Sequence, residues 1–137
     1  MNEGLAATYR MTAEEAELLD LVQKMLDAIH TGDAEEYRAL CALDLSCYET
    51  DVVPYRIDVL QFHLDMIATS KRSGAYDDLV RCDLLNPRVQ LYGDFGIVTY
   101  TRLLTFSVAV PAFRTFNETR VFARLGGAWR MVHFHRS

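Results

Sequence analysis

The chain has 137 residues, of which 50% are hydrophobic and 11% aromatic, so it suits one domain with a single core and is too apolar to be disordered. Its formal net charge of −5 at pH 7 argues against general nucleic-acid binding, because neutralising phosphates requires a basic face. The basic residues are dispersed and no apolar run reaches the length of a membrane span, so we expect no membrane partner either.

The cysteines and the N-terminus indicate the compartment. Cys41, Cys47 and Cys82 are odd in number and lack the close spacing of a metal site. Reduced, structural thiols are typical of the cytoplasm, and the first residues (MNEGLAATYRM) contain no apolar stretch of a signal peptide. We therefore predict a cytoplasmic protein with no metal and no cofactor.

Helical patterns occupy the first half of the chain. Thr12 and Glu15 form a capping box, in which the Thr hydroxyl accepts an amide hydrogen while the Glu side chain reaches back. An apolar stripe at helical spacing follows, and Gly32 suits the left-handed residue that ends such a helix. The stripe consists of Leu18, Leu21, Val22, Met25, Leu26 and Ile29.

Two shorter helices are predicted next. Asp33 is placed to cap a helix that carries Tyr37, Leu40 and Cys41. A third helical pattern spans about 56–69, and it is apolar on one face. That face consists of Ile57, Leu60, Leu64 and Ile67.

From Tyr76 onward the sequence predicts strands, separated by Asn-Pro, Gly-Asp, Pro and Gly-Gly turn signals. The runs span about Leu79–Leu85, Arg88–Tyr92, Ile97–Val110, Phe116–Leu125 and Trp129–Arg136. Helices followed by antiparallel strands predict an α+β domain with the helices on one face of the sheet. We divide the chain into a tail with its helix cap, 1–13, and a single domain, 14–137.

Arg102 is the clearest candidate for a binding residue. It interrupts an otherwise apolar face in mid-strand, and that face reads Val98, Tyr100, Arg102, Leu104 and Phe106. Burying a guanidinium group without a partner is costly, so a carboxylate or a bound anion should lie opposite. The structural alternative is an ion pair with Glu49, Glu118 or an aspartate, and both arrangements can coexist.

The opposite face of the same strand suggests self-association. Its alternate residues are apolar or threonine, which suits a contact between two copies better than open water. They are Ile97, Thr99, Thr101, Leu103 and Thr105.

A C-terminal hairpin forms the second candidate cluster. Its strands flank Gly126-Gly127, which accepts the positive φ angles of a tight turn. Regular alternation from this turn gathers four polar side chains on one face, and these form the cluster: Glu118, Arg120, His133 and His135. Phe134 and Arg136 then lie on the opposite face. Side chains like those of the cluster rarely crowd the end of an apolar strand unless an anion meets them, so the hairpin predicts one wall of a polar pocket.

Short segments along the chain also resemble those of a known family, in a specific order and at specific separations. They are Ala28-Ile29-His30-Thr31-Gly32-Asp33 with Tyr37, Tyr48-Glu49, Phe62-His63, Leu85-Asn86-Pro87, Gly93-Asp94, Tyr100-Thr101-Arg102, Glu118-Thr119-Arg120 and His133-Phe134-His135-Arg136. From about Glu14 to Ser137 the chain is similar to the association (hub) domain of calcium/calmodulin-dependent protein kinase II, within the SnoaL-like, nuclear transport factor 2-like superfamily.

The resemblance implies a fold and a partner. The fold is cystatin-like or nuclear transport factor 2-like, a curved antiparallel sheet forming a cone around the N-terminal helices. The main partner is the protein itself, as a homo-oligomer built from dimers that could extend to a larger ring. The residues before Glu14 are too few for a kinase domain, so we expect no kinase activity from them.

The resemblance also implies a pocket for a small carboxylate or other anion. Its charge would come from three arginines, with His63 and Tyr37 orienting the ligand. The ligand-binding candidates are Arg102, Arg120, Arg136, His63, Tyr37, His133, His135 and Tyr100.

The family and the alternation disagree about Arg136, which the family places in the pocket. A β-bulge between Arg120 and Arg136 would reconcile the two, because one extra residue reverses the facing of all that follow. We therefore keep Arg136 among the pocket candidates. The chain also departs from animal hub domains at Lys71, where they have a tryptophan eight residues after His63, on the loop 70–78 beside the pocket.

Three guanidinium groups in one cavity repel each other, so an empty site needs an internal counter-charge. Glu118 and Glu49 are the available carboxylates. We expect Arg120 or Arg136 to be held by a glutamate, with Arg102 left freer for the ligand.

The same residues allow two alternatives to an anion pocket: a metal site and an enzyme active site. His133 and His135 lack a third metal ligand at recognisable spacing, and adjacent arginines would repel a cation. A ketosteroid-isomerase-like or polyketide-cyclase-like enzyme would use a histidine, including His63, as its base. Because the predicted pocket is cationic and poor in unpaired carboxylates, we favour a non-catalytic, self-associating domain over an enzyme.

Overall fold

The computed structural model describes residues 10–49, 52–107 and 109–137. Within these ranges, three helices and one strand precede a run of four strands, so the structure is α+β as predicted. Most of the predicted tail, 1–13, lies outside the described residues, although its helix cap at Thr12 lies within them.

Helix α2 (Ala13–Thr31) begins and ends where the sequence predicts. The Thr12 hydroxyl accepts from the Glu15 amide and the Glu15 carboxylate accepts from the Thr12 amide, so the capping box is confirmed. Gly32 ends the helix at a φ of 76°, a left-handed conformation that costs glycine little. Leu18, Val22, Met25 and Leu26 of the apolar stripe are buried, while Leu21 and Ile29 are half-buried.

Helix α3 (Ala34–Ala39) is capped by Asp33, as predicted, but it ends before Cys41. Cys41 instead begins strand β1 (Cys41–Glu49), which the sequence did not reveal. This strand lies at one edge of the sheet and pairs in parallel with the last strand of the chain. Its sequence, CALDLSCYE, has no clean two-residue alternation, and its partner lies far along the chain, so local patterns could not identify it.

Helix α4 (Leu60–Ser73) begins later than predicted and also extends further. Ile57, which was expected on the apolar face of this helix, makes a bridge to Cys47 beside β1. The helix ends at Gly74 with a φ of 73°, so Lys71 and Arg72 lie in its last turn rather than on a loop.

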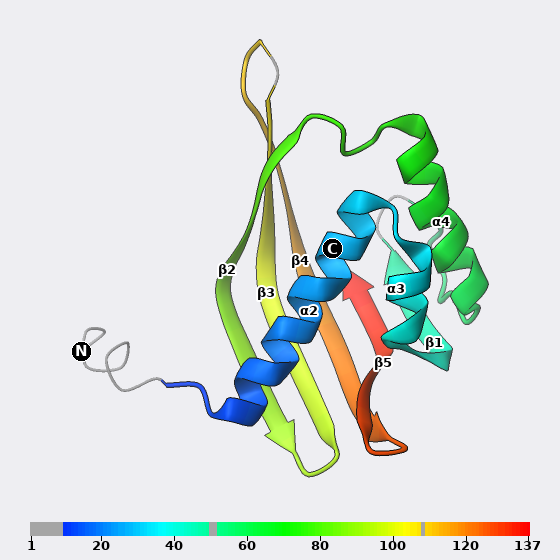
Figure 1. The fold of residues 1–137 in the computed structure, drawn as a ribbon, viewed down its shortest axis with the longest axis vertical. Coiled ribbons are helices and arrows are strands. Elements are labelled where there is room, and N and C mark those ends of the chain that lie inside the picture. Colours follow the sequence, from blue (N-terminus) through cyan, green and yellow to red (C-terminus); the bar gives the residue numbers. More distant parts are fainter. Residues whose placement is uncertain (1–9, 50–51, 108) are drawn as a thin grey trace.

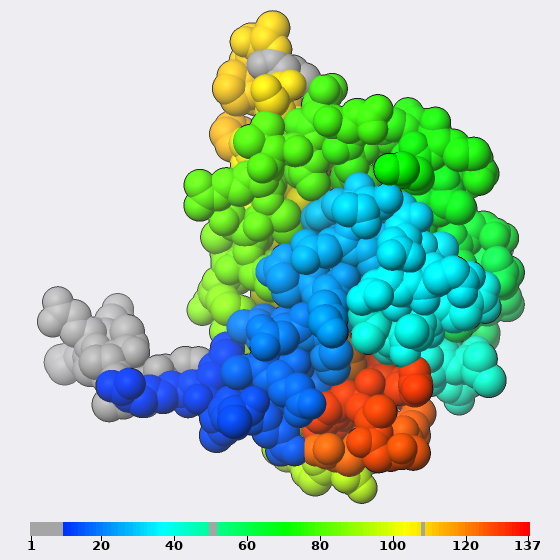
Figure 2. Space-filling model, in the orientation of Figure 1, coloured from blue at the N-terminus to red at the C-terminus, as the bar shows by residue number. Residues whose placement is uncertain are grey.

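The strands form one five-stranded, curved and unclosed sheet in the order β1-β5-β4-β3-β2. They are β2 (Leu79–Tyr92), β3 (Phe95–Phe106), β4 (Ala112–Leu125) and β5 (Ala128–Arg136). Helix α2 runs across one face of this sheet, with α3 and α4 beside it (Figure 1). The helices cover the middle of this face and leave β2 and β5 visible beside them, while the end of the β3–β4 hairpin projects beyond them (Figure 2).

Strand β2 joins two runs that the sequence predicts separately, and its pairing with β3 is irregular between Leu85 and Arg88. Asn86 has a φ of 51° at this irregularity, a conformation that asparagine tolerates better than most residues. Strand β3 alternates as predicted: Val98, Tyr100 and Arg102 are buried, and the residues between them are half-buried on the outer face.

Strand β5 contains the predicted bulge. Met131 pairs with Phe122, but the next pair is His133 with Val121, so Val132 is the extra residue. Beyond the bulge, Phe134 pairs with Arg120 and Arg136 pairs with Glu118. The extra residue therefore turns Phe134 and Arg136 inward, toward the helices, and turns His133 and His135 outward.

Candidate functional site

A partly enclosed cavity of about 200 Å³ lies between the helices and the inner face of the sheet. One of its walls is largely apolar and comes from the last turns of α2 and from α4, while the sheet supplies guanidinium groups. The lining residues are Ile29, Glu49, His63, Met66, Ile67, Ser70, Ala75, Tyr76, Arg102, Arg114, Arg120, Phe134 and Arg136.

Arg102 lies deep in this cavity and has two partners. Its Nη1 donates to Glu118 Oε2 at 3.0 Å, and its Nη2 lies 2.8 Å from His30 Nε2, which accepts. Both Arg102 and Glu118 are 2% exposed. Burial by itself would raise the pKa of the Glu118 carboxyl, but Arg120, Arg102 and the Tyr100 hydroxyl together hold it below its usual value.

Arg120 is fully buried and held mainly by two tyrosines. Its Nε donates to the Tyr100 hydroxyl at 2.8 Å, and its Nη1 donates to the Tyr37 hydroxyl at 3.1 Å. The guanidinium carbon lies 4.2 Å from the centre of the Phe134 ring. Tyr37 and Tyr100 are behind the cavity wall rather than among its lining residues, so they position Arg120.

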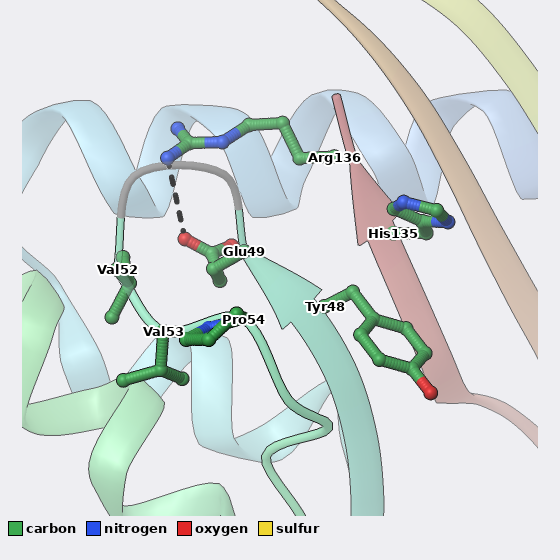
Figure 3. A pocket seen from close by; sticks show the side chains of 7 residues that line it. All are labelled: Tyr48, Glu49, Val52, Val53, Pro54, His135 and Arg136. Carbon is green, nitrogen blue, oxygen red and sulfur yellow. Dashed lines mark ion pairs between the residues drawn. The ribbon is translucent and has the colours of Figure 1, made fainter.

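Arg136 closes the site toward the end of the sheet. Its Nη2 lies 3.4 Å from Glu49 Oε2. The two residues also line a more open hollow of about 420 Å³, together with Tyr48, His135 and the segment Val52–Pro54. Figure 3 shows this ion pair between the ends of β1 and β5. The pair thus separates the partly enclosed cavity from the open hollow. Burial raises the pKa of Glu49 despite the nearby arginines.

His63 lies in the cavity wall, as the family resemblance implied. Its ring stacks on Tyr37 with centroids 4.9 Å apart and meets the edge of Phe134. Burial, and then the charges of Arg120 and Arg136, lower the pKa of His63 to about 3. The imidazole is therefore neutral at physiological pH and is a weak base.

His133 and His135 do not belong to this cavity, in contrast to the sequence prediction. The bulge turns both to the outer face of the sheet, where the His133 ring lies 2.8 Å from the Ser46 hydroxyl and His135 is exposed. Two of the three histidines considered as catalytic bases are thus outside the cavity, and the third is a weak base at neutral pH.

The expected division of roles among the arginines is wrong for Arg102. Glu118 makes its shortest ion pair with Arg102, at 3.0 Å, and reaches Arg120 only at 3.6 Å. Glu118 is therefore paired more closely with Arg102 than with Arg120. The expectation for Arg136 agrees with the structure, because Glu49 is its counter-charge.

Sequence reasoning missed three residues of the site. His30, near the end of α2, contacts Arg102 and lies beside the Tyr76 ring, and burial followed by the Arg102 charge lowers its pKa to about 4. Arg114 lines the cavity from β4. Phe116 lies beneath three guanidinium groups, with Arg136, Arg114 and Arg102 at 4.4, 5.1 and 6.0 Å from its ring centre. His30 belongs to a segment that resembles the family. Arg114 lies after the turn signal at Pro111 and before the predicted start of the next strand, so no pattern in the sequence marked it as a pocket residue.

Other kinds of site find no support within the described ranges. No group of three His, Cys, Asp or Glu side chains there is arranged to hold a metal ion. None of the described helices combines the length and apolar character needed to cross a bilayer.

Residues 14–137 match the family described as the calcium/calmodulin dependent protein kinase II association domain. The chain is 31% identical over 130 residues to calcium/calmodulin-dependent protein kinase type II subunit delta of Oryctolagus cuniculus. That match covers 91% of this chain and 24% of the relative, so the chain spans about a quarter of the length of that kinase.

Solved structures show the same relationship. The association domain of C. elegans CaMKII is 29% identical and has a TM-score of 0.81, with 91% of this chain and 95% of that chain covered. A nuclear transport factor 2-like protein with a cystatin-like fold from Novosphingobium aromaticivorans is 18% identical, with a TM-score of 0.74 and coverage of 90% of this chain and 80% of that chain. This second likeness concerns the fold alone, and it confirms the predicted fold class. By its match over residues 14–137, the chain belongs to the calcium/calmodulin-dependent protein kinase II association domain family.

Proposed function

We propose that this chain is a non-catalytic, self-associating cytoplasmic domain whose inner cavity binds a small carboxylate. Ligand binding is supported chiefly by one observation: guanidinium groups from β3, β4 and β5 converge on one cavity. A carboxylate can receive two parallel hydrogen bonds from a guanidinium group, and the low dielectric of a cavity strengthens such charge-assisted bonds.

Self-association is supported by family membership and by the outer face of the sheet. Ile97, Thr101 and Leu103 lie on this face and are only half-buried. The Thr101 hydroxyl donates to Asn117 Oδ1 across β3 and β4, so these two polar atoms are paired within the sheet. Such a face can be covered by a second copy with little desolvation cost. We propose homodimers formed through this face as the unit of any larger assembly.

Light scattering at micromolar concentration tests the self-association. The wild-type protein should be a dimer or larger, and Leu103→Glu should reduce its mass, because the change buries an unpaired charge in the contact. Gln23→Glu, which adds the same charge to an exposed position on α2, should leave the mass unchanged. A monomeric wild-type protein would overturn this part of the proposal.

Calorimetry with a short monocarboxylate such as butyrate tests the cavity. Arg102→Ala should weaken binding by about 1.5–3 kcal/mol, the range for hydrogen bonds to charged groups. Arg81→Ala, which removes an exposed arginine paired with Asp83 on β2, is the matched control and should bind like the wild type. Equal affinity in Arg102→Ala and the wild type would show that Arg102 does not contact the ligand.

A further inference from the structure

The charges around the inner cavity do not balance. Four guanidinium groups line it: Arg102, Arg114, Arg120 and Arg136. Glu49 is the counter-charge of Arg136, while Glu118 is the single counter-charge of both Arg102 and Arg120. The imidazoles of His30 and His63 add no positive charge at neutral pH, since burial depresses the pKa of both. Two positive charges in and around the cavity are therefore uncompensated.

One excess charge lies at the inner end of the cavity. Arg102 and Arg120 are 2% and 0% exposed and share the single carboxylate of Glu118. Nη2 of Arg120 is buried and makes no hydrogen bond to any described residue, its approach to Glu118 being 3.6 Å. A buried N–H group without an acceptor is costly, so this end of the cavity favours an added anionic oxygen.

The other excess charge lies at the rim. Arg114 is exposed, and no described carboxylate lies within ion-pair distance of its guanidinium group. Its contact is the Phe116 ring, at 5.1 Å, which it shares with Arg136. The ring orients Arg114 beside the cavity without neutralising it. Arg114 thus remains available for a second anionic group at the rim.

The helix side of the cavity provides an apolar stretch of lining. Ile29, Met66, Ile67 and Ala75 form this part of the wall. A cavity of about 200 Å³ holds roughly seven groups of water size at about 30 Å³ each. The space therefore suits a short hydrocarbon chain with a charged group at each end.

We propose that the preferred ligand is a short dicarboxylate. This proposal rests on the proposed carboxylate-binding function. One carboxylate accepts hydrogen bonds from Arg102 and Arg120 at the inner end, and the other pairs with Arg114 at the rim. A monocarboxylate would satisfy the inner end and leave Arg114 without a counter-charge.

Calorimetry at pH 7.5 with succinate and butyrate, which have the same number of carbons, tests this proposal. Succinate should bind the wild-type protein at least about tenfold more tightly, because it pairs with one more guanidinium group. Arg114→Gln should reduce that preference to less than about threefold, because it removes the counter-charge of the second carboxylate. Arg88→Gln, an exposed arginine on β2 outside the cavity, should keep the full preference.

The outcomes separate this proposal from the function on which it rests. If succinate and butyrate bind the wild type equally, the cavity is a monocarboxylate site and the dicarboxylate proposal is wrong. If Arg114→Gln keeps the wild-type preference for succinate, Arg114 is not the second contact and the proposal is also wrong. If neither compound binds, the carboxylate-binding function itself fails.

Discussion

Glu118 is the most connected acidic side chain of the site. Its Oε1 accepts from the Tyr100 hydroxyl at 2.6 Å, and its Oε2 accepts from Arg102 at 3.0 Å. Tyr100 in turn accepts from Arg120. One buried carboxylate therefore fixes two arginines and a tyrosine, and this network decides which guanidinium atoms face the cavity.

Replacing this carboxylate should cost stability. In Glu118→Gln, two buried guanidinium groups lose their shared counter-charge, so the free energy of unfolding should fall by about 3–5 kcal/mol. Urea unfolding measures the change. Glu14→Gln, at the partly exposed pair with Arg124, should cost less than about 1 kcal/mol.

The same variant also distinguishes a structural from a functional carboxylate. Butyrate binding to folded Glu118→Gln should be unchanged or tighter, because the cavity becomes more positive. Loss of butyrate binding without loss of stability would contradict the structural role and would favour a catalytic or ligand-contacting role for Glu118.

His63 should make stability depend on pH. Its pKa is lowered from 6.5 to about 3 in the folded protein, first by burial and then by Arg120 and Arg136. Between these values the unfolded chain binds more protons, so the stabilising effect is complete above pH 6.5 and is lost progressively as the pH falls toward 3. His63 alone should contribute a slope of about 1.4 kcal/mol per pH unit within this window, to which His30, with its pKa lowered to about 4, adds.

Urea unfolding at pH 7.5, 6 and 5 can measure this slope. His63→Phe keeps the ring stack on Tyr37 but removes the titrating group, so its stability should depend less steeply on pH than that of the wild type. His135→Phe changes an exposed histidine on the outer face and serves as the control. An unchanged slope in His63→Phe would mean that His63 is not the group responsible.

At the scale of elements, the helices and most strands could be predicted because their signals are local. The capping box at Thr12, the glycine at Gly32 and the alternation of β3 each depend on residues that are close in sequence. Strand β1 could not be predicted, since its parallel partner, β5, lies almost a full domain away along the chain. The shifted start of α4 has a similar origin, because Ile57 pairs with Cys47.

The bulge in β5 was inferred only because the family and the alternation disagreed about Arg136. Val132 is the residue that decides the facing of everything after it. Deleting Val132 should join Met131 to His133 in regular pairing and keep Phe134 and Arg136 inward, at a cost of about 1–3 kcal/mol. Deleting both Val132 and His133 should instead turn Phe134 and Arg136 outward, because Phe134 then directly follows the inward-facing Met131.

The double deletion should therefore abolish cooperative unfolding, while the single deletion should retain it. Near-ultraviolet circular dichroism and urea unfolding compare the two variants. A double-deletion variant as stable as the single-deletion variant would show that the bulge does not determine the facing of β5.

At the scale of the whole molecule, the proposed association should be visible in thermal stability. If only folded chains associate, the melting temperature rises with protein concentration. Wild-type protein should show this rise, and Leu103→Glu should not. Because the proposed outer-face contact is apolar and rich in threonine, the rise should persist at high salt. A melting temperature independent of wild-type concentration would contradict the association.

The sequence by itself determined the α+β class, the positions of α2 and four strands, the burial of Arg102 and the likeness to the association-domain family. These features follow from capping, periodicity and the order of short segments, all of which can be seen in a linear chain. Only the tertiary structure decided which glutamate holds which arginine, that His133 and His135 face outward, and that Arg114 reaches the cavity. The physical reason is that ion pairing and cavity lining depend on distances across the sheet, which a single bulge residue and one long-range parallel pairing can change.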